Sequence, residues 1–133
     1  MNNIYMYFIA MISILQIYGN VMVTFKIDST ISLINQELIE SCVTEDSKLL
    51  ALEYNDLSLL EINHLMLKET IDGILNDNLD FLQFSSKYYF YDNVSMINCP
   101  IGYYYCNSVQ ILITILYDSK TYERTLRYEP IKK

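Results

Sequence analysis

The first part of the chain is uncharged and almost wholly apolar. No Asp, Glu, Lys or Arg precedes Lys26, and residues 4–25 consist mainly of Ile, Met, Tyr, Phe and Val. As an α-helix this segment would be about 33 Å long, close to the roughly 30 Å hydrocarbon core of a bilayer. The pattern therefore predicts a transmembrane or signal-type helix over residues 1–25 and a single domain over residues 26–133.

Three environments would suit such a helix: an uncleaved membrane anchor, a signal peptide cleaved near Gly19, or the interior of a soluble protein. Cleavage is disfavoured because no basic residue precedes the apolar run and no Ala-x-Ala-like pair follows it. A soluble core is disfavoured because even buried helices usually keep one polar stripe. We favour an anchor, with these residues among those that face lipid: Ile4, Phe8, Ile12, Ile14, Leu15, Val21 and Phe25.

Apolar residues at helical spacing continue beyond the uncharged segment. Polar residues separate the members of this series, which are Ile27, Ile31, Ile34, Leu38 and Cys42. The spacing predicts one long helix from residue 4 to about residue 42, amphipathic only in its second half. We expect Ile27, Ile31, Ile34 and Leu38 to belong to an assembly helix that makes protein contacts.

The middle of the chain alternates between turn signals and helical spacing. Residues 43–58 contain two helix-start signals around a short apolar piece, and we interpret them as a linker. Apolar residues return at helical spacing over residues 59–75, and the polar run 76–78 ends the pattern. This predicts a second, short helix.

The last third has the pattern of β-structure. Residues 81–91 are aromatic and β-prone, and a turn follows at residues 92–93. Residues 108–117 and 122–128 both alternate between two faces, with a short turn at residues 118–120. This pattern predicts a β-hairpin.

The composition of the two hairpin strands predicts their places in the sheet. The first is apolar on both faces, so we expect it to be central, with the long helix covering one side. The second carries charges and should form an edge. The expected fold class is α+β, with a long, partly transmembrane N-terminal helix, a second short helix and a small antiparallel sheet that includes a C-terminal hairpin.

Composition excludes several functions. The net charge is −7, and the nine Lys and Arg residues are scattered, which disfavours nucleic-acid binding. A hydrophobic content of 52% with 13 Tyr is incompatible with a disordered chain. The lone histidine, His64, lies in the predicted second helix and is expected at the surface or its boundary. We expect no catalytic residues, no bound metal and no cofactor, and therefore no enzyme.

Cys99 and Cys106 flank a segment that contains Pro100 and Gly102, which provide a bend. A disulfide between them is expected, with two buried thiols as the alternative, and it would place the domain outside the cytosol. Cys42 is expected to be a small core residue rather than an intermolecular bridge.

The loop between these two cysteines is rich in tyrosine. Tyr103, Tyr104 and Tyr105 are a possible partner loop, because tyrosine offers a large, rigid contact area. Packing of the three rings against the hairpin is the alternative.

The order of these elements resembles pilin-like and Tad-type pseudopilin-like proteins of bacterial secretion, competence and conjugation systems. The resemblance is carried by residues 34–37 after the anchor, by Asn78 and Leu79, and by the closing hairpin at residues 110–129. The prepilin processing site is not matched, because Gly19 lacks a basic leader and Thr24 stands where mature pilins carry glutamate. The resemblance implies that the apolar helices bundle while the sheet faces outward.

The expected function is therefore that of a membrane-anchored, pilin-like structural or assembly subunit of a secretion, conjugation or surface-appendage system. The expected location is the cell membrane, crossed once, with the C-terminal domain outside the cytosol. Its expected partners are the membrane and either other proteins or further copies, through the N-terminal helix. The alternative is a secreted or tethered surface binding domain that uses the tyrosine-rich disulfide loop.

Overall fold

The computed structural model describes residues 2–99 and 106–130. Four α-helices, one 3₁₀-helix and four strands follow one another along this part of the chain. They are α1 (Asn2–Ile31), α2 (Gln36–Ser41), α3 (Glu45–Tyr54), η1 (Leu57–Leu59), α4 (His64–Asn78), β1 (Gln83–Tyr91), β2 (Asn98–Cys99), β3 (Ser108–Tyr117) and β4 (Lys120–Tyr128).

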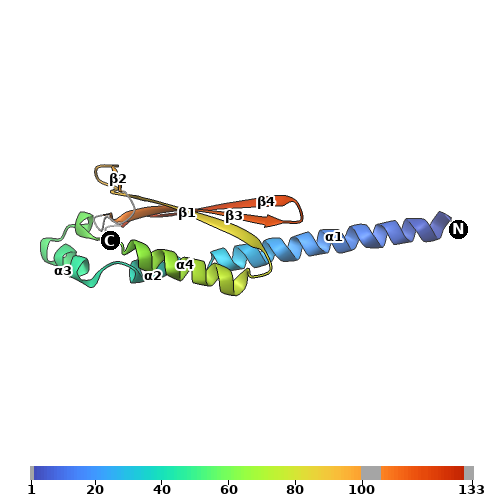
Figure 1. Cartoon of the computed structure of the whole chain (residues 1–133), viewed down its shortest axis with the longest axis horizontal. Coiled ribbons are helices and arrows are strands. Elements are labelled where there is room, and N and C mark those ends of the chain that lie inside the picture. Colours follow the sequence, from blue (N-terminus) through green and yellow to red (C-terminus); the bar gives the residue numbers. More distant parts are fainter. Residues whose placement is uncertain (1, 100–105, 131–133) are drawn as a thin grey trace.

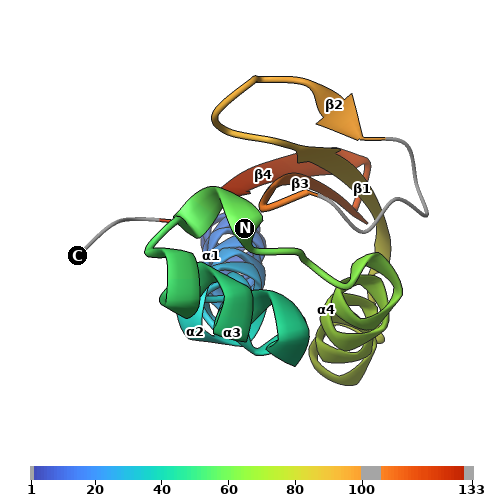
Figure 2. The ribbon, with the colours of Figure 1, turned by 90° about the vertical axis from the view of Figure 1, so that its left-hand side faces the viewer.

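The four strands form one antiparallel sheet in the order β2-β1-β3-β4. The C-terminal half of α1 and the whole of α4 lie side by side against one face of this sheet (Figures 1 and 2). The N-terminal half of α1 projects away from the folded part, which we call the head (Figure 1). The expected α+β class is confirmed.

The predicted hairpin is also confirmed, and its register shows how the sheet separates its two faces. Ile111 pairs with Leu126 and Ile113 with Arg124, so every second β3 residue points toward the helices. β3 lies between β1 and β4, and β4 is an edge strand, as its charges predicted. The turn residues Asp118 and Ser119 both have positive φ, the conformation of the two-residue turns that match the twist of antiparallel strands.

The core lies between the helices and this inner face of the sheet. Many of its fully buried members come from α1, α4, β3 and the segment before α4, and these include Ile27, Ile62, Leu67, Ile71, Leu75, Ile111, Ile113 and Ile115. A single cluster therefore binds the end of the long helix to the sheet and to the second helix.

Polar contacts reinforce the same arrangement. The guanidinium of Arg124, on β4, donates to the carboxylate of Asp28 on α1 at 2.8 Å. On the other side of the core, Asp72 of α4 accepts hydrogen bonds from Ser86 and Tyr88 of β1, each at 3.0 Å. Each helix is thus joined by its own polar contact to the strand above it.

The prediction of one helix from residue 4 to about residue 42 is wrong, because α1 ends at Ile31. The hydroxyl groups of Ser29 and Thr30 donate to the carbonyl of Lys26, and that of Ser32 donates to the carbonyl of Ser29. Such contacts compete with helix continuation. Asn35 then caps a new helix, α2, by accepting from the amide of Leu38.

The interpretation of residues 43–58 as a linker is wrong as well, since they contain α3 and η1. Thr44 is the N-cap of α3, and Glu45 and Asp46 occupy its first turn, where carboxylates favour helix formation. The second predicted helix exists but begins later, at His64, with Asn63 as its N-cap. β1 begins at Gln83 rather than at residue 81.

The core makes a testable prediction. Replacing Ile113 by alanine is expected to lower the free energy of unfolding by about 2–5 kcal/mol, because it leaves a cavity at the centre of β3. Thr125→Ala on the exposed side of β4 should change it by no more than about 0.5 kcal/mol. Urea titration of both full-length variants in mild detergent measures the difference, and equal effects would contradict this account of the core.

Candidate membrane-facing and partner-binding surfaces

The projecting half of α1 is apolar on every side. All seven residues predicted to face lipid are exposed, from Ile12 at 47% to Ile4 and Phe25 at 69%. Residues 3–18 are exposed throughout, so this half of the helix is not buried in its own domain. The span Asn3–Ile31 is long and apolar enough to cross a membrane.

The other half of α1 enters the head. Val23 and Thr30 are buried and Ile27 is completely enclosed, whereas Lys26 and Asp28 remain exposed. The residues expected to form an assembly helix lie here and beyond: Ile34 is buried in the turn after α1, and Ile31 and Leu38 are half-buried against the core. These side chains thus contact the head of their own chain.

A hollow of about 510 Å³ separates the β3–β4 turn from α1. The helix contributes Gln16, Gly19 and Asn20 to its walls, together with Ile12 and Leu15. The turn contributes Tyr117, Asp118 and Lys120. The charged tip of the hairpin therefore faces residues 12–20 of the uncharged segment rather than its end at Phe25.

The opposite end of the head carries the disulfide. Cys99 at the end of β2 is bonded to Cys106, with 6.3 Å between their Cα atoms. The carbonyl of Cys106 accepts a hydrogen bond from the amide of Ile62 at 2.8 Å, which ties this bridge to the helical layer. Tyr103, Tyr104 and Tyr105 lie outside the described residues.

Cys42 takes the place predicted for it. Its thiol is free and buried, and it belongs to the core cluster rather than to the surface. It is therefore unavailable for a bridge to another chain while the head is folded.

The β1–β2 turn exposes three apolar side chains beside the disulfide, those of Val94, Met96 and Ile97. Met96 has a φ of 58°, a left-handed conformation that is uncommon for residues other than glycine. The residue pattern did not indicate this group, because isolated apolar residues in a turn have no periodicity.

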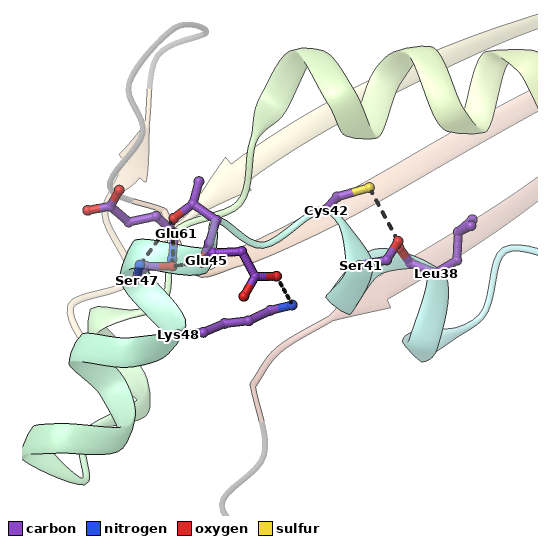
Figure 3. A network of polar contacts seen from close by, with 8 residues as sticks. Leu38, Ser41, Cys42, Glu45, Ser47, Lys48 and Glu61 are labelled. Carbon is purple, nitrogen blue, oxygen red and sulfur yellow. Dashed lines mark hydrogen bonds and ion pairs between the residues drawn. The ribbon is translucent and has the colours of Figure 1, made fainter.

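α3 places its leucines on the outside. Ser47 and Ala51 are its buried residues, whereas Leu49, Leu52 and Tyr54 are exposed, Leu52 at 84%. A polar network holds this orientation: Ser47 accepts from the amide of Glu61 at 3.0 Å and donates to the carbonyl of Thr44 at 2.8 Å (Figure 3). Because the small side chain of Ser47 occupies the inner position of α3, the larger side chains of Leu49 and Leu52 face outward and remain exposed.

The expectation for His64 is wrong, because its side chain is only 2% exposed. The ring stacks on Phe90 with 3.6 Å between centroids, and within the described chain neither ring nitrogen has a hydrogen-bond partner. Burial lowers the pKa of His64, and the positive charge of Lys68 lowers it further. The first position of α4 faces the sheet, which residue spacing alone did not show.

The described residues contain no group of three or more His, Cys, Asp or Glu side chains that could hold a metal ion. Comparison with protein-family models, with curated proteins and with solved structures found no match to this chain. The exposed apolar helix and the surfaces of the head are therefore the features from which function is inferred.

The buried histidine predicts acid sensitivity. Its pKa lies below the usual 6.5 in the folded chain, so the unfolded chain binds the proton first as pH falls. The contribution of neutral His64 to the free energy of unfolding is complete above about pH 6.5. Below that pH the free energy of unfolding falls by at most about 1.4 kcal/mol per pH unit. His64→Phe should show a smaller loss between pH 7 and pH 5.5 in urea titrations.

His64 is the only histidine, which makes the comparison specific. Glu61 works in the opposite direction, because burial raises its pKa, but it is present in both proteins. Equal pH dependence of the two proteins would show that His64 does not titrate on unfolding.

The disulfide predicts that the stability of the head depends on redox conditions. Closing so short a loop, with a sequence separation of 7, is expected to contribute about 2.5 kcal/mol on the chain-entropy account. A reductant should lower the free energy of unfolding by this amount, whereas Cys99→Ala/Cys106→Ala should not respond. Thiol counting by mass spectrometry provides the check: an oxidised preparation should contain one free thiol, that of Cys42, and three free thiols would refute the bridge.

Proposed function

We propose that this chain is a membrane-anchored, pilin-like structural or assembly subunit of a secretion, conjugation or surface-appendage system. The observation that carries the proposal is the half of α1 that is apolar on every side and uncovered by its own head. Such a surface is stable only in lipid or against other apolar helices. Membrane anchoring and lateral association of helices both satisfy this requirement.

The disulfide supports an orientation with the head outside the cytosol. Such bonds form and persist in oxidising compartments, and thiol-reducing systems remove most of them in the cytosol. The bridge between Cys99 and Cys106 lies at the end of the head furthest from the projecting helix, as Figure 1 shows for β2. The head is therefore proposed to point away from the membrane into the extracytoplasmic space.

An apolar strip beside the head supports assembly. Tyr18, Val21, Met22 and Phe25 are all exposed, although α1 already contacts the head at this level through Val23. Because Ile27 and Ile34 are used inside the head, lateral contacts between subunits are assigned to this strip and to the projecting half of α1.

A tethered surface binding domain is the second candidate. It is favoured by the exposed Val94, Met96 and Ile97 beside the disulfide, since apolar side chains at a loop tip are typical of a contact surface. On this account the helix only tethers the head. A chain shortened by residues 1–18 would keep Val23 and Ile27 in the core, remain a soluble monomer and still bind its partner.

A charge introduced into the projecting helix tests whether this helix is held in lipid or is only exposed. Ile12→Asp places a carboxylate where about 2.5–3.5 kcal/mol is needed to hold it in hydrocarbon, so membrane binding should fall about a hundredfold. Subunit association should be lost with it. Membrane fractionation and crosslinking measure the two effects.

Ile12→Leu and the exposed head variant Thr125→Asp are the matched controls, and both should fractionate as the unmodified chain does. If Ile12→Asp stays with the membrane fraction, the anchor is wrong. If it leaves the membrane but still assembles, the apolar helix is not the assembly surface.

A further inference from the structure

We propose that the edge of the hydrocarbon crosses α1 between Leu15 and Asn20, and that the β3–β4 turn rests among phospholipid head groups at this level. The inference rests on the membrane anchoring proposed above. It moves the edge inward from Phe25 and Lys26, where the first charge would place it.

The β3–β4 turn and α1 line the same hollow. Asp118 and Lys120 line it from the hairpin, and Gln16, Gly19 and Asn20 line it from α1. The two segments are far apart in sequence, yet they surround the same space. With α1 along the membrane normal, a plane parallel to the membrane that passes this part of the helix passes the turn as well.

The turn cannot enter hydrocarbon at modest cost. Asp118 and Lys120 are charged and exposed, and a charged side chain at depth in a bilayer costs several kilocalories per mole. The turn also cannot swing away freely, because β3 and β4 are paired along their whole length up to Tyr117 and Lys120. The bond from Arg124 to Asp28 holds this hairpin against α1.

The side chains of α1 change character at the same level. Between residues 4 and 15 the only non-aromatic polar side chain is Ser13, whereas Gln16 and Asn20 follow within two turns. Tyr18 lies between them and is 63% exposed, and tyrosine is enriched where hydrocarbon meets head groups. A boundary here places Gln16, Tyr18 and Asn20 at the level of the head groups, whereas a boundary at Phe25 would bury all three in hydrocarbon.

The length of helix below this level is sufficient to enter the far leaflet. Residues 3–15 extend for about 20 Å, more than half of a roughly 30 Å hydrocarbon core. Val21, Met22 and Phe25 then lie above the hydrocarbon, beside the head.

Two charge insertions test the position of the boundary in the full-length chain. Phe25→Asp should lower the binding to phosphatidylcholine vesicles less than threefold, because residue 25 is then outside hydrocarbon. Ile12→Asp should lower it about a hundredfold. Phe25 is 69% exposed, so its replacement leaves the core of the head intact. Comparable losses in both variants would overturn the boundary.

Spin labels test the position of the boundary by a second method. Labels are attached to Ile12→Cys, Phe25→Cys and Ser119→Cys, one at a time, in a Cys42→Ala background that keeps the disulfide. In phosphatidylcholine vesicles the label at 12 should be accessible to oxygen but not to a water-soluble nickel chelate, and the label at 25 should be accessible to nickel. The label at 119 should report head-group depth.

The outcomes distinguish a failure of the proposed boundary from a failure of the proposed membrane anchor. A label at 25 that reports hydrocarbon, or a label at 119 that reports bulk water, overturns the proposed boundary while anchoring stands. If the label at 12 also reports water, the membrane anchor itself is wrong and the boundary falls with it.

Discussion

The structure depends on the way in which a single helix, α1, meets two different surroundings along its length. Its C-terminal half is held in the head because Ile27 is completely buried in the same cluster as Ile111 and Ile113 of the central strand. Its N-terminal half has no such cover. Since the helix is continuous from Asn2 to Ile31, packing at one end fixes the direction in which the uncovered end leaves the head.

This constraint makes the head and the projecting helix one mechanical unit. The hairpin is tied to α1 by Arg124 and Asp28, so the β3–β4 turn keeps a set height along the helix. The ion pair itself is partly exposed and contributes little energy, whereas the burial of Ile27 contributes much more. The role assigned to the pair is therefore geometric: it limits how far the hairpin can move from the helix.

The end of the head remote from the helix has a different construction. There the core residues Ile62 and Phe90 are joined by a disulfide, by backbone bonds around Ile62 and by the hydroxyl of Ser47. One result is that Leu49 and Leu52 remain outside, and another is that apolar side chains of the β1–β2 turn are exposed. Both ends of the molecule thus present apolar surface, but the uncharged helix presents far more of it.

The fold was largely predictable where residue patterns report local structure. The uncharged helix, the hairpin with its central and edge strands, the polar stop after Asn78 and the burial of Cys42 all follow from periodicity or composition, because each depends on neighbours close in sequence. The helix break before Asn35 did not, because the apolar spacing continues across it while serine and threonine hydroxyls bind the backbone. The helix at Glu45 was missed because its leucines face outward and give no inward stripe.

The amino-acid sequence by itself determined that the chain begins with a helix apolar on every side and ends in an antiparallel hairpin, since charge and alternation are properties of the residues alone. Only the tertiary structure decided that His64 is enclosed against Phe90 and that the hairpin turn stands level with Gln16 and Asn20. The physical reason is that both depend on contacts between segments distant in the chain, which core packing sets and local spacing does not record.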